Sequence, residues 1–199
     1  VDPRTGQISE PIAGLPAIAS CGQAGLLDVA LGPQFANNRT IYFSFSEPGE
    51  GNLSGTSVAR ARLTDTGLED VRVIYQQRPK VASNGHFGSR LVFGRDGTLF
   101  ITQGDRQGAQ FRAQAQQLTN GFGKLMRINT DGTIPRDNPF VGREDVLPEI
   151  YSYGHRNIQG ATLHPQTGQL WTIEHGPRGG DELNRPEPGK NYGWPVIGY

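Results

Sequence analysis

Three stretches of this chain repeat one pattern, and the repeat constrains the fold more than any other feature. In each, apolar residues alternate with polar ones, a turn rich in Gly, Pro, Asn or Asp follows, and a second β-rich run ends at polar residues. The stretches span residues 27–46, 91–105 and 161–177. Alternation with a period of two around such turns is typical of a β-hairpin, so the sequence predicts three hairpins.

The spacing of the repeats predicts the architecture. Their starts lie roughly 60 to 70 residues apart, which leaves room for about four strands per unit and suits the blades of a β-propeller. We therefore expect an all-β chain in which residues 1–199 form one partial propeller domain of about three blades. Radial folds close with about four to eight blades, so we expect the remaining blades to lie outside these residues. Residues 111–118 depart from the β pattern and predict a short helix or a loop insertion without chemistry.

Composition excludes several kinds of partner. Lys and Arg total 19, as do Asp and Glu, so the formal charge is zero and disfavours nucleic acid or an anionic membrane as a partner. No apolar run approaches the length of a membrane span. The single cysteine, Cys21, excludes an intrachain disulfide. The sequence starts at Val1 without an apolar leader, and we expect a periplasmic or secreted protein whose signal peptide has been removed.

The first candidate for catalysis is His86. It lies between Gly85 and Gly88, and one hairpin later the chain reaches Asp105. The two ends of a hairpin lie close together, so Asp105 is expected near His86, where a carboxylate orients an imidazole and raises its basicity. The alternative is a histidine that only hydrogen-bonds a neighbouring loop. The flanking glycines leave room for a ligand to approach the ring.

Two further clusters contain polar groups at loop positions. In residues 153–160, Arg156 can pair with a carboxylate or a developing oxyanion, and Asn157 and Gln159 can add neutral contacts; a hydrogen-bond network between blades is the alternative. In residues 174–184, Asp181 and Glu182 stand beside Gly and Pro, and such carboxylate and main-chain oxygens suit Ca²⁺, although a solvated acidic turn has the same composition. No zinc-protease, Walker A or Rossmann motif is present in its proper context.

The clusters together resemble the soluble PQQ-dependent glucose and aldose sugar dehydrogenases, in motif and in order, from about residue 23 to residue 199. The motifs are QAGLLD at 23–28, GHFGSR at 85–90, GD at 104–105, GHRNIQG at 154–160, GP at 176–177 with DE at 181–182, and NYGWP at 191–195. Any one alone is weak, whereas their joint occurrence is specific.

The resemblance implies a six-bladed β-propeller that carries PQQ across the mouth of its central channel. His86 then matches the base that takes the proton of the anomeric hydroxyl while hydride passes to the quinone, and Asp105 matches its acidic partner. Arg156 matches the cation beside the quinone oxygens, and Asn157 and Gln159 match contacts to the cofactor.

The resemblance also implies calcium. Gly176 and Pro177 match the pair whose main-chain carbonyls bind the Ca²⁺ next to PQQ, and Glu182 and the carbonyl of Tyr192 match ligands of additional Ca²⁺ ions. Gln23 matches a residue near the substrate. The implied partners are an aldose sugar, which is oxidised to its lactone, an external electron acceptor and a second copy in a homodimer.

Two departures from the family pattern modify these expectations. Gly85 stands where the glucose-specialised branch has an acidic residue, which favours a broader range of aldoses. The Lys and Arg residues that bind the PQQ carboxylates in later blades lie outside this sequence, so we expect residues 1–199 alone to bind PQQ poorly.

Two other functions stay open at this point. A catalytically silent propeller that only binds a protein or glycan should have lost His86, Asp105 or Arg156, and all three are present. A Ca²⁺-dependent propeller lactonase would use side-chain carboxylates as the main ligands of its catalytic metal.

Overall fold

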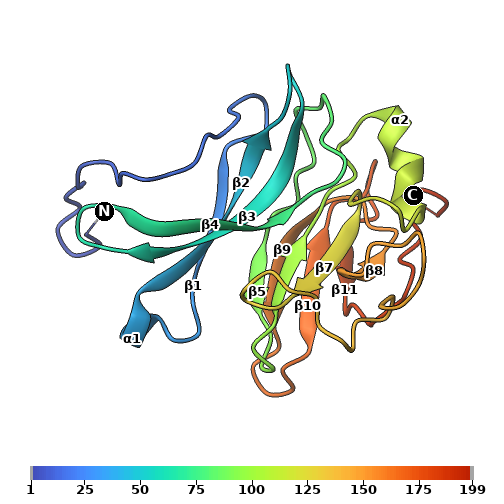
Figure 1. The fold of residues 1–199 in the computed structure, drawn as a ribbon. Helices are drawn as coiled ribbons and strands as arrows, with labels where there is room; N and C mark the ends of the chain where they lie inside the picture. Colours follow the sequence, from blue (N-terminus) through green and yellow to red (C-terminus); the bar gives the residue numbers. More distant parts are fainter. Residues whose placement is uncertain (1, 198–199) are drawn as a thin grey trace.

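The strands form three antiparallel sheets that follow one another along the chain (Figure 1). The structure, a computed structural model, describes residues 2–197. The first sheet contains β1 (Leu26–Leu31), β2 (Thr40–Pro48), β3 (Ser54–Leu63) and β4 (Leu68–Gln76). The second contains β5 (Leu91–Phe93), β6 (Leu99–Thr102), β7 (Lys124–Ile128) and β8 (Ile150–Tyr153), and the third β9 (Ile158–Leu163), β10 (Leu170–Glu174) and β11 (Glu182–Asn184).

The three predicted hairpins are confirmed as β1–β2, β5–β6 and β9–β10, each antiparallel. The first hairpin differs in detail, because its connection contains a short helix, α1 (Phe35–Asn38). Residues 111–118 include the end of α2 (Ala109–Arg112) and the 3-10 helix η1 (Ala113–Gln116), as the expected interruption of the β pattern.

Two hydrophobic clusters join neighbouring sheets, and another has buried residues of the first sheet only. Tyr42 and Val58 of the first sheet pack in one cluster with Leu99 and Met126 of the second. Phe100 and Leu125 of the second sheet pack with residues of the third in another cluster. All five residues of β7 are buried because this strand has a neighbouring sheet on both faces.

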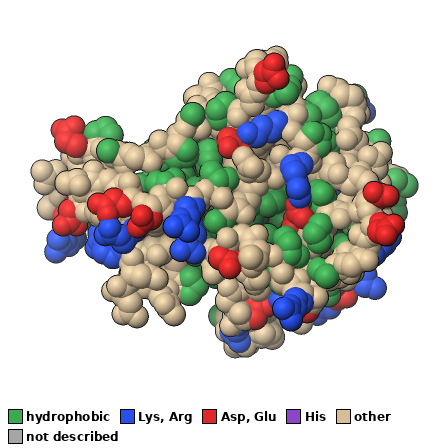
Figure 2. All heavy atoms as spheres, in the orientation of Figure 1, with side chains coloured by type: hydrophobic (Ala, Val, Ile, Leu, Met, Phe, Trp, Pro, Cys, Tyr) green, Lys and Arg blue, Asp and Glu red, His purple; other side chains and the backbone are tan. Residues whose placement is uncertain are grey.

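The loops that connect the strands lie at two opposite ends of the sheets, and the two ends differ in the residues that they carry. Loops 19–25, 83–90 and 103–108 lie where β1 and β5 begin and β6 ends, which we call the site end. Turns 32–39, 94–98 and 129–133 lie at the opposite ends of the same strands, which we call the far end. Acidic and basic side chains are interspersed over the face shown in Figure 2, in keeping with the zero net charge. Within residues 2–197, no helix has the length and apolar character needed to cross a membrane.

Candidate active site

The structure brings His86 and Asp105 together at the site end. His86 Nδ1 lies 2.7 Å from Asp105 Oδ1, and the carboxylate is fully buried. An ionised carboxylate only accepts hydrogen bonds, so beside an ionised Asp105 a neutral His86 carries its proton on Nδ1 and has a free lone pair on Nε2. A Cβ atom on Gly104 would lie 2.1 Å from the His86 carbonyl oxygen. The glycine before Asp105 is therefore what lets the two loops meet.

The backbone around this pair is strained. His86, Ser89, Arg106 and Gln107 all have positive φ angles, of 50°, 94°, 63° and 63°, although none is glycine. Such conformations cost energy and persist only where surrounding contacts enforce them. Strain gathered next to an imidazole–carboxylate pair is typical of a functional site.

Arg106 supplies many of these enforcing contacts, and sequence reasoning missed it. Its fully buried guanidinium donates to the carbonyls of Ser83 and Gly85, on the loop that carries His86, and to the carbonyl of Ser54 on β3. It also stacks over Phe87, with Cζ 3.8 Å from the ring centroid. Burial lowers the pKa of Arg106 to about 10. No sequence pattern pointed to it, because three of its hydrogen-bond partners are main-chain carbonyls and all of its partners lie in other segments of the chain.

The second cluster reaches the same place from the start of β9. The Asn157 side-chain oxygen accepts from the Gly88 amide at 3.0 Å, and the Gln159 carbonyl accepts from Arg90 Nε at 2.8 Å. Arg156 donates to the His175 carbonyl at 3.0 Å. Asn157 and Gln159 therefore tie the third sheet to the His86 loop, as the alternative of a network between blades anticipated.

Glu174 organises the backbone under this cluster and was also missed. Its carboxylate accepts from the Arg156 and Asn157 amides and from His155. Burial acts to raise the pKa of Glu174, but the His155 charge and these hydrogen bonds outweigh it and hold the pKa below its ordinary value. The main chain of Arg156 is thereby fixed, while its guanidinium keeps most of its N–H donors for a ligand.

His86 and the second cluster border one cleft of about 320 Å³. Its lining consists of Gln23, Leu27, residues 86–90, Arg156, Asn157, Gln159 and His175. Gln23 is fixed there because its side-chain oxygen accepts from the His86 amide at 2.8 Å. The cleft lining thus contains two histidines, two arginines and three residues with side-chain amides.

The predicted calcium residues surround an adjoining cavity of about 310 Å³, which shares Arg156 and His175 with the cleft. Gly176, Pro177, Glu182 and Tyr192 all line it. A Cβ atom on Gly176 would lie 1.9 Å from the Gly179 carbonyl oxygen and 2.7 Å from that of Gly180, so main-chain oxygens crowd this loop. Oxygen donors of this kind fit Ca²⁺. Residues 2–197 hold no group of three or more His, Cys, Asp or Glu side chains placed for a metal.

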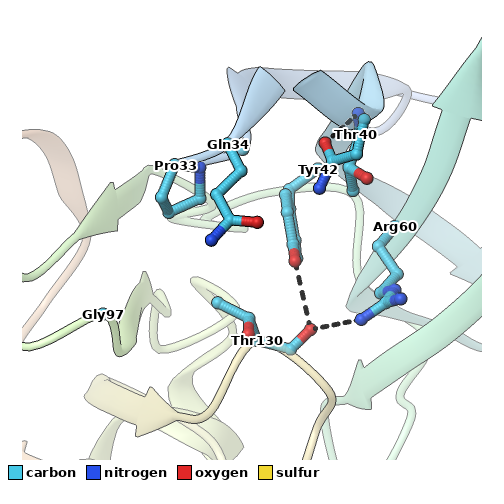
Figure 3. Close-up of a pocket in the computed structure, with 9 residues that line it drawn as sticks. Pro33, Gln34, Thr40, Tyr42, Arg60, Gly97 and Thr130 are labelled. Atoms are coloured by element: carbon cyan, nitrogen blue, oxygen red, sulfur yellow. Dashed lines mark hydrogen bonds between the residues drawn. The ribbon is translucent and has the colours of Figure 1, made fainter. Parts of the chain in front are cut away.

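A third cavity, of about 320 Å³, lies at the far end between the first two sheets (Figure 3). Figure 3 shows Tyr42 and Arg60 from the first sheet both pointing to Thr130. Their hydroxyl and guanidinium donate to the Thr130 carbonyl at 3.2 and 3.3 Å. These polar groups link the two sheets, and this cavity has no histidine or carboxylate in its lining.

Comparisons with known proteins agree with the fold and with the motifs. The family described as Glucose / Sorbosone dehydrogenase matches residues 1–199. Aldose sugar dehydrogenase YliI of Escherichia coli strain K12 is 47% identical over 192 residues, which cover 96% of this chain and 51% of that protein.

Solved structures superpose closely. A glucose dehydrogenase, 50% identical, matches with a TM-score of 0.93 over 98% of this chain and 57% of its own. The PQQ-bound form of an aldose sugar dehydrogenase from Streptomyces coelicolor, 30% identical, matches with a TM-score of 0.80 over 92% of this chain and 51% of its own. The chain spans about half the length of the relatives it matches, and the predicted partial β-propeller is confirmed.

Proposed function

Because the chain belongs to the glucose/sorbosone dehydrogenase family, we propose that its protein oxidises aldose sugars to lactones and passes the electrons to an external acceptor. The observation that carries this proposal is the His86–Asp105 pair at the wall of the cleft. The names of the similar proteins support an aldose as the substrate class. A periplasmic or secreted location and a homodimer stay predictions.

In this proposal His86 is the general base. Asp105 holds the Nδ1 proton, and the other ring nitrogen, Nε2, makes no hydrogen bond to any residue the structure describes. Its lone pair can therefore take the proton of the sugar's anomeric hydroxyl as the anomeric carbon loses hydride. The buried Asp105 carboxylate stabilises the imidazolium that forms, and does so strongly because water is excluded.

The donors around the cleft fit an anionic, oxygen-rich quinone. Arg156 keeps guanidinium donors for it, and Asn157 and Gln159 supply neutral side-chain amides. PQQ, when bound, supplies the two-electron acceptor for the hydride, and Ca²⁺ polarises it as a Lewis acid. We assign that Ca²⁺ to the carbonyls of Gly176 and Pro177.

Three more assignments complete the proposed site. Glu182 and the Tyr192 carbonyl are assigned to further Ca²⁺ ions. The Gln23 oxygen is held by the His86 amide, which leaves its amide nitrogen to meet a sugar hydroxyl. A Cβ atom on Gly85 would lie 2.0 Å from Gln107 Oε1, at the end of a flexible side chain, so a larger residue here requires Gln107 to move. An acidic residue cannot enter here without displacing Gln107, in keeping with a broad range of aldoses.

The test is reduction of an artificial dye by the intact protein with PQQ, Ca²⁺ and a panel of aldoses. His86→Ala should lower kcat by roughly 10²- to 10⁴-fold, as the loss of a general base does. His164→Ala is the matched control, because His164 lies in the β9–β10 turn at the far end and should leave kcat unchanged. Equal activity of His86→Ala and wild type would exclude His86 as the base.

PQQ binding without turnover of any aldose would instead support the silent binding propeller, and release of acid from a lactone without dye reduction would support the lactonase.

A further inference from the structure

We propose that Trp194 is a positioning residue that holds the Asp105 carboxylate, and through it the His86 ring, in the orientation that proton abstraction requires. The inference rests on the proposed function for its meaning in the reaction. The contact itself stands on the structure, because Trp194 Nε1 donates to Asp105 Oδ2 at 2.8 Å across 89 positions of sequence.

The two oxygens of Asp105 have different partners. Oδ1 accepts from His86 Nδ1 at 2.7 Å and from the Gln107 amide at 2.8 Å, while Oδ2 accepts from Trp194. A carboxylate held at one oxygen alone can still rotate about its Cβ–Cγ bond, and a bond at each oxygen stops that rotation. Asp105 has no exposed surface, so water cannot replace the indole. The indole N–H is therefore the group that completes the fixation of Asp105.

Trp194 is itself held firmly. Its amide donates to the Gly154 carbonyl at 2.9 Å, and the Gln116 side chain donates to its carbonyl at 2.6 Å. The side chain is buried, with 9% of the residue exposed. The helical segment that interrupts the β pattern therefore helps to position Trp194, because η1 contains Gln116, whose side chain holds the Trp194 backbone.

The face of the same indole meets Arg156. The guanidinium carbon lies 5.5 Å from the ring, within the range of a cation–π contact. One rigid side chain therefore contacts both the acid behind the base and the cation proposed for the cofactor.

A spectroscopic experiment reads this contact without any turnover. In ¹⁵N-labelled intact protein free of PQQ, Trp194→Phe assigns the indole N–H signal of Trp194. Asp105→Asn should shift that signal and speed its hydrogen exchange, because the acceptor loses its charge. The indole signal of Trp171 is the internal reference, since its buried Nε1 has no hydrogen-bond partner among the described residues. Trp194→Phe should also change the ring ¹⁵N shifts of His86. A Trp194 signal indifferent to Asp105→Asn, or His86 shifts indifferent to Trp194→Phe, would overturn the proposal.

Kinetics add the second readout. Trp194→Phe keeps the ring face and loses only the donor, so kcat should fall roughly 10- to 100-fold, the effect of losing a hydrogen bond to a charged group, with KM nearly unchanged. In the double variant with Asp105→Asn, the two losses should not multiply, because both remove one interaction. Multiplying losses, or a rise in KM alone, would contradict positioning. If wild type itself oxidises no aldose, the proposed function fails, and the NMR signals still decide whether Trp194 orients the pair.

Discussion

The first and second sheets meet along a seam whose two ends differ in kind. At the far end, Tyr42 and Arg60 share one main-chain carbonyl, and the one buried charge beside it, Arg127, is paired with the partly exposed carboxylates of Asp96 and Asp137. At the site end, Asp105 and Arg106 are fully buried, and four non-glycine residues have positive φ. The same strands lead to both ends, so the strand framework does not cause the difference. The far end joins the sheets, whereas the site end holds an energetically costly arrangement around the proposed base, His86.

The largest expected effect comes from a methyl group at the closest backbone approach. Gly104→Ala places Cβ 2.1 Å from the His86 carbonyl oxygen and 2.6 Å from Asn157 Oδ1, so the loops must separate. We expect a loss of at least about 3 kcal/mol in unfolding free energy, measured by urea denaturation. Gly97→Ala at the far end is the control, because its φ is +81° but nothing lies within 4 Å of its Cβ. It should cost about 1 kcal/mol, and equal losses would show that the two ends do not differ in packing.

The next effect compares two arginines along the seam. Arg106→Met leaves the carbonyls of Ser83 and Gly85 without their donor inside the protein and removes one of the two donors to the Ser54 carbonyl, so it should cost about 2 to 3 kcal/mol in the same assay. Arg60→Met removes one hydrogen bond from a half-buried side chain and should cost less than about 1 kcal/mol. A larger loss from Arg60→Met would reverse the comparison.

A smaller effect is the pH dependence of stability that a buried lysine at the site end should produce. Burial lowers the pKa of Lys124 from 10.5 to about 7, and its amine donates only to main-chain carbonyls, among them that of Ala115 at 3.0 Å. Above pH 7 the folded protein holds this amine neutral, while the unfolded chain keeps it protonated. Unfolding then takes up a proton, so stability rises with pH, by about 2 kcal/mol between pH 7 and 9.

Lys124→Met separates this contribution from the rest of the chain. The variant lacks the titrating amine, so its unfolding free energy should rise less between pH 7 and 9 than that of wild type. Whatever the variant does to stability at a single pH, only this slope bears on the prediction. Equal slopes in the two proteins would show that Lys124 stays protonated in the fold.

Short-range patterns in the sequence determined much of this protein. Alternating residues around Gly- and Asp-containing turns placed all three hairpins, and the spacing of the repeats placed the sheets. The pairing of His86 with Asp105 also followed from the sequence, because a hairpin brings its own two ends together. The motifs that carry the family resemblance all lie at loops of this kind.

Only the tertiary structure revealed the contacts of Trp194, Arg106 and Glu174. Trp194 meets Asp105 across 89 positions, and Arg106 binds carbonyls of β3 and of the His86 loop. Every residue has a main-chain carbonyl, so a sequence does not show which carbonyls accept hydrogen bonds from a side chain. Contacts between loops of different sheets also produce no periodic pattern in the sequence. Alternation and turn chemistry act between neighbours in the chain, so they fix the hairpins. The orientation of the base depends on side chains that meet only after the sheets have packed.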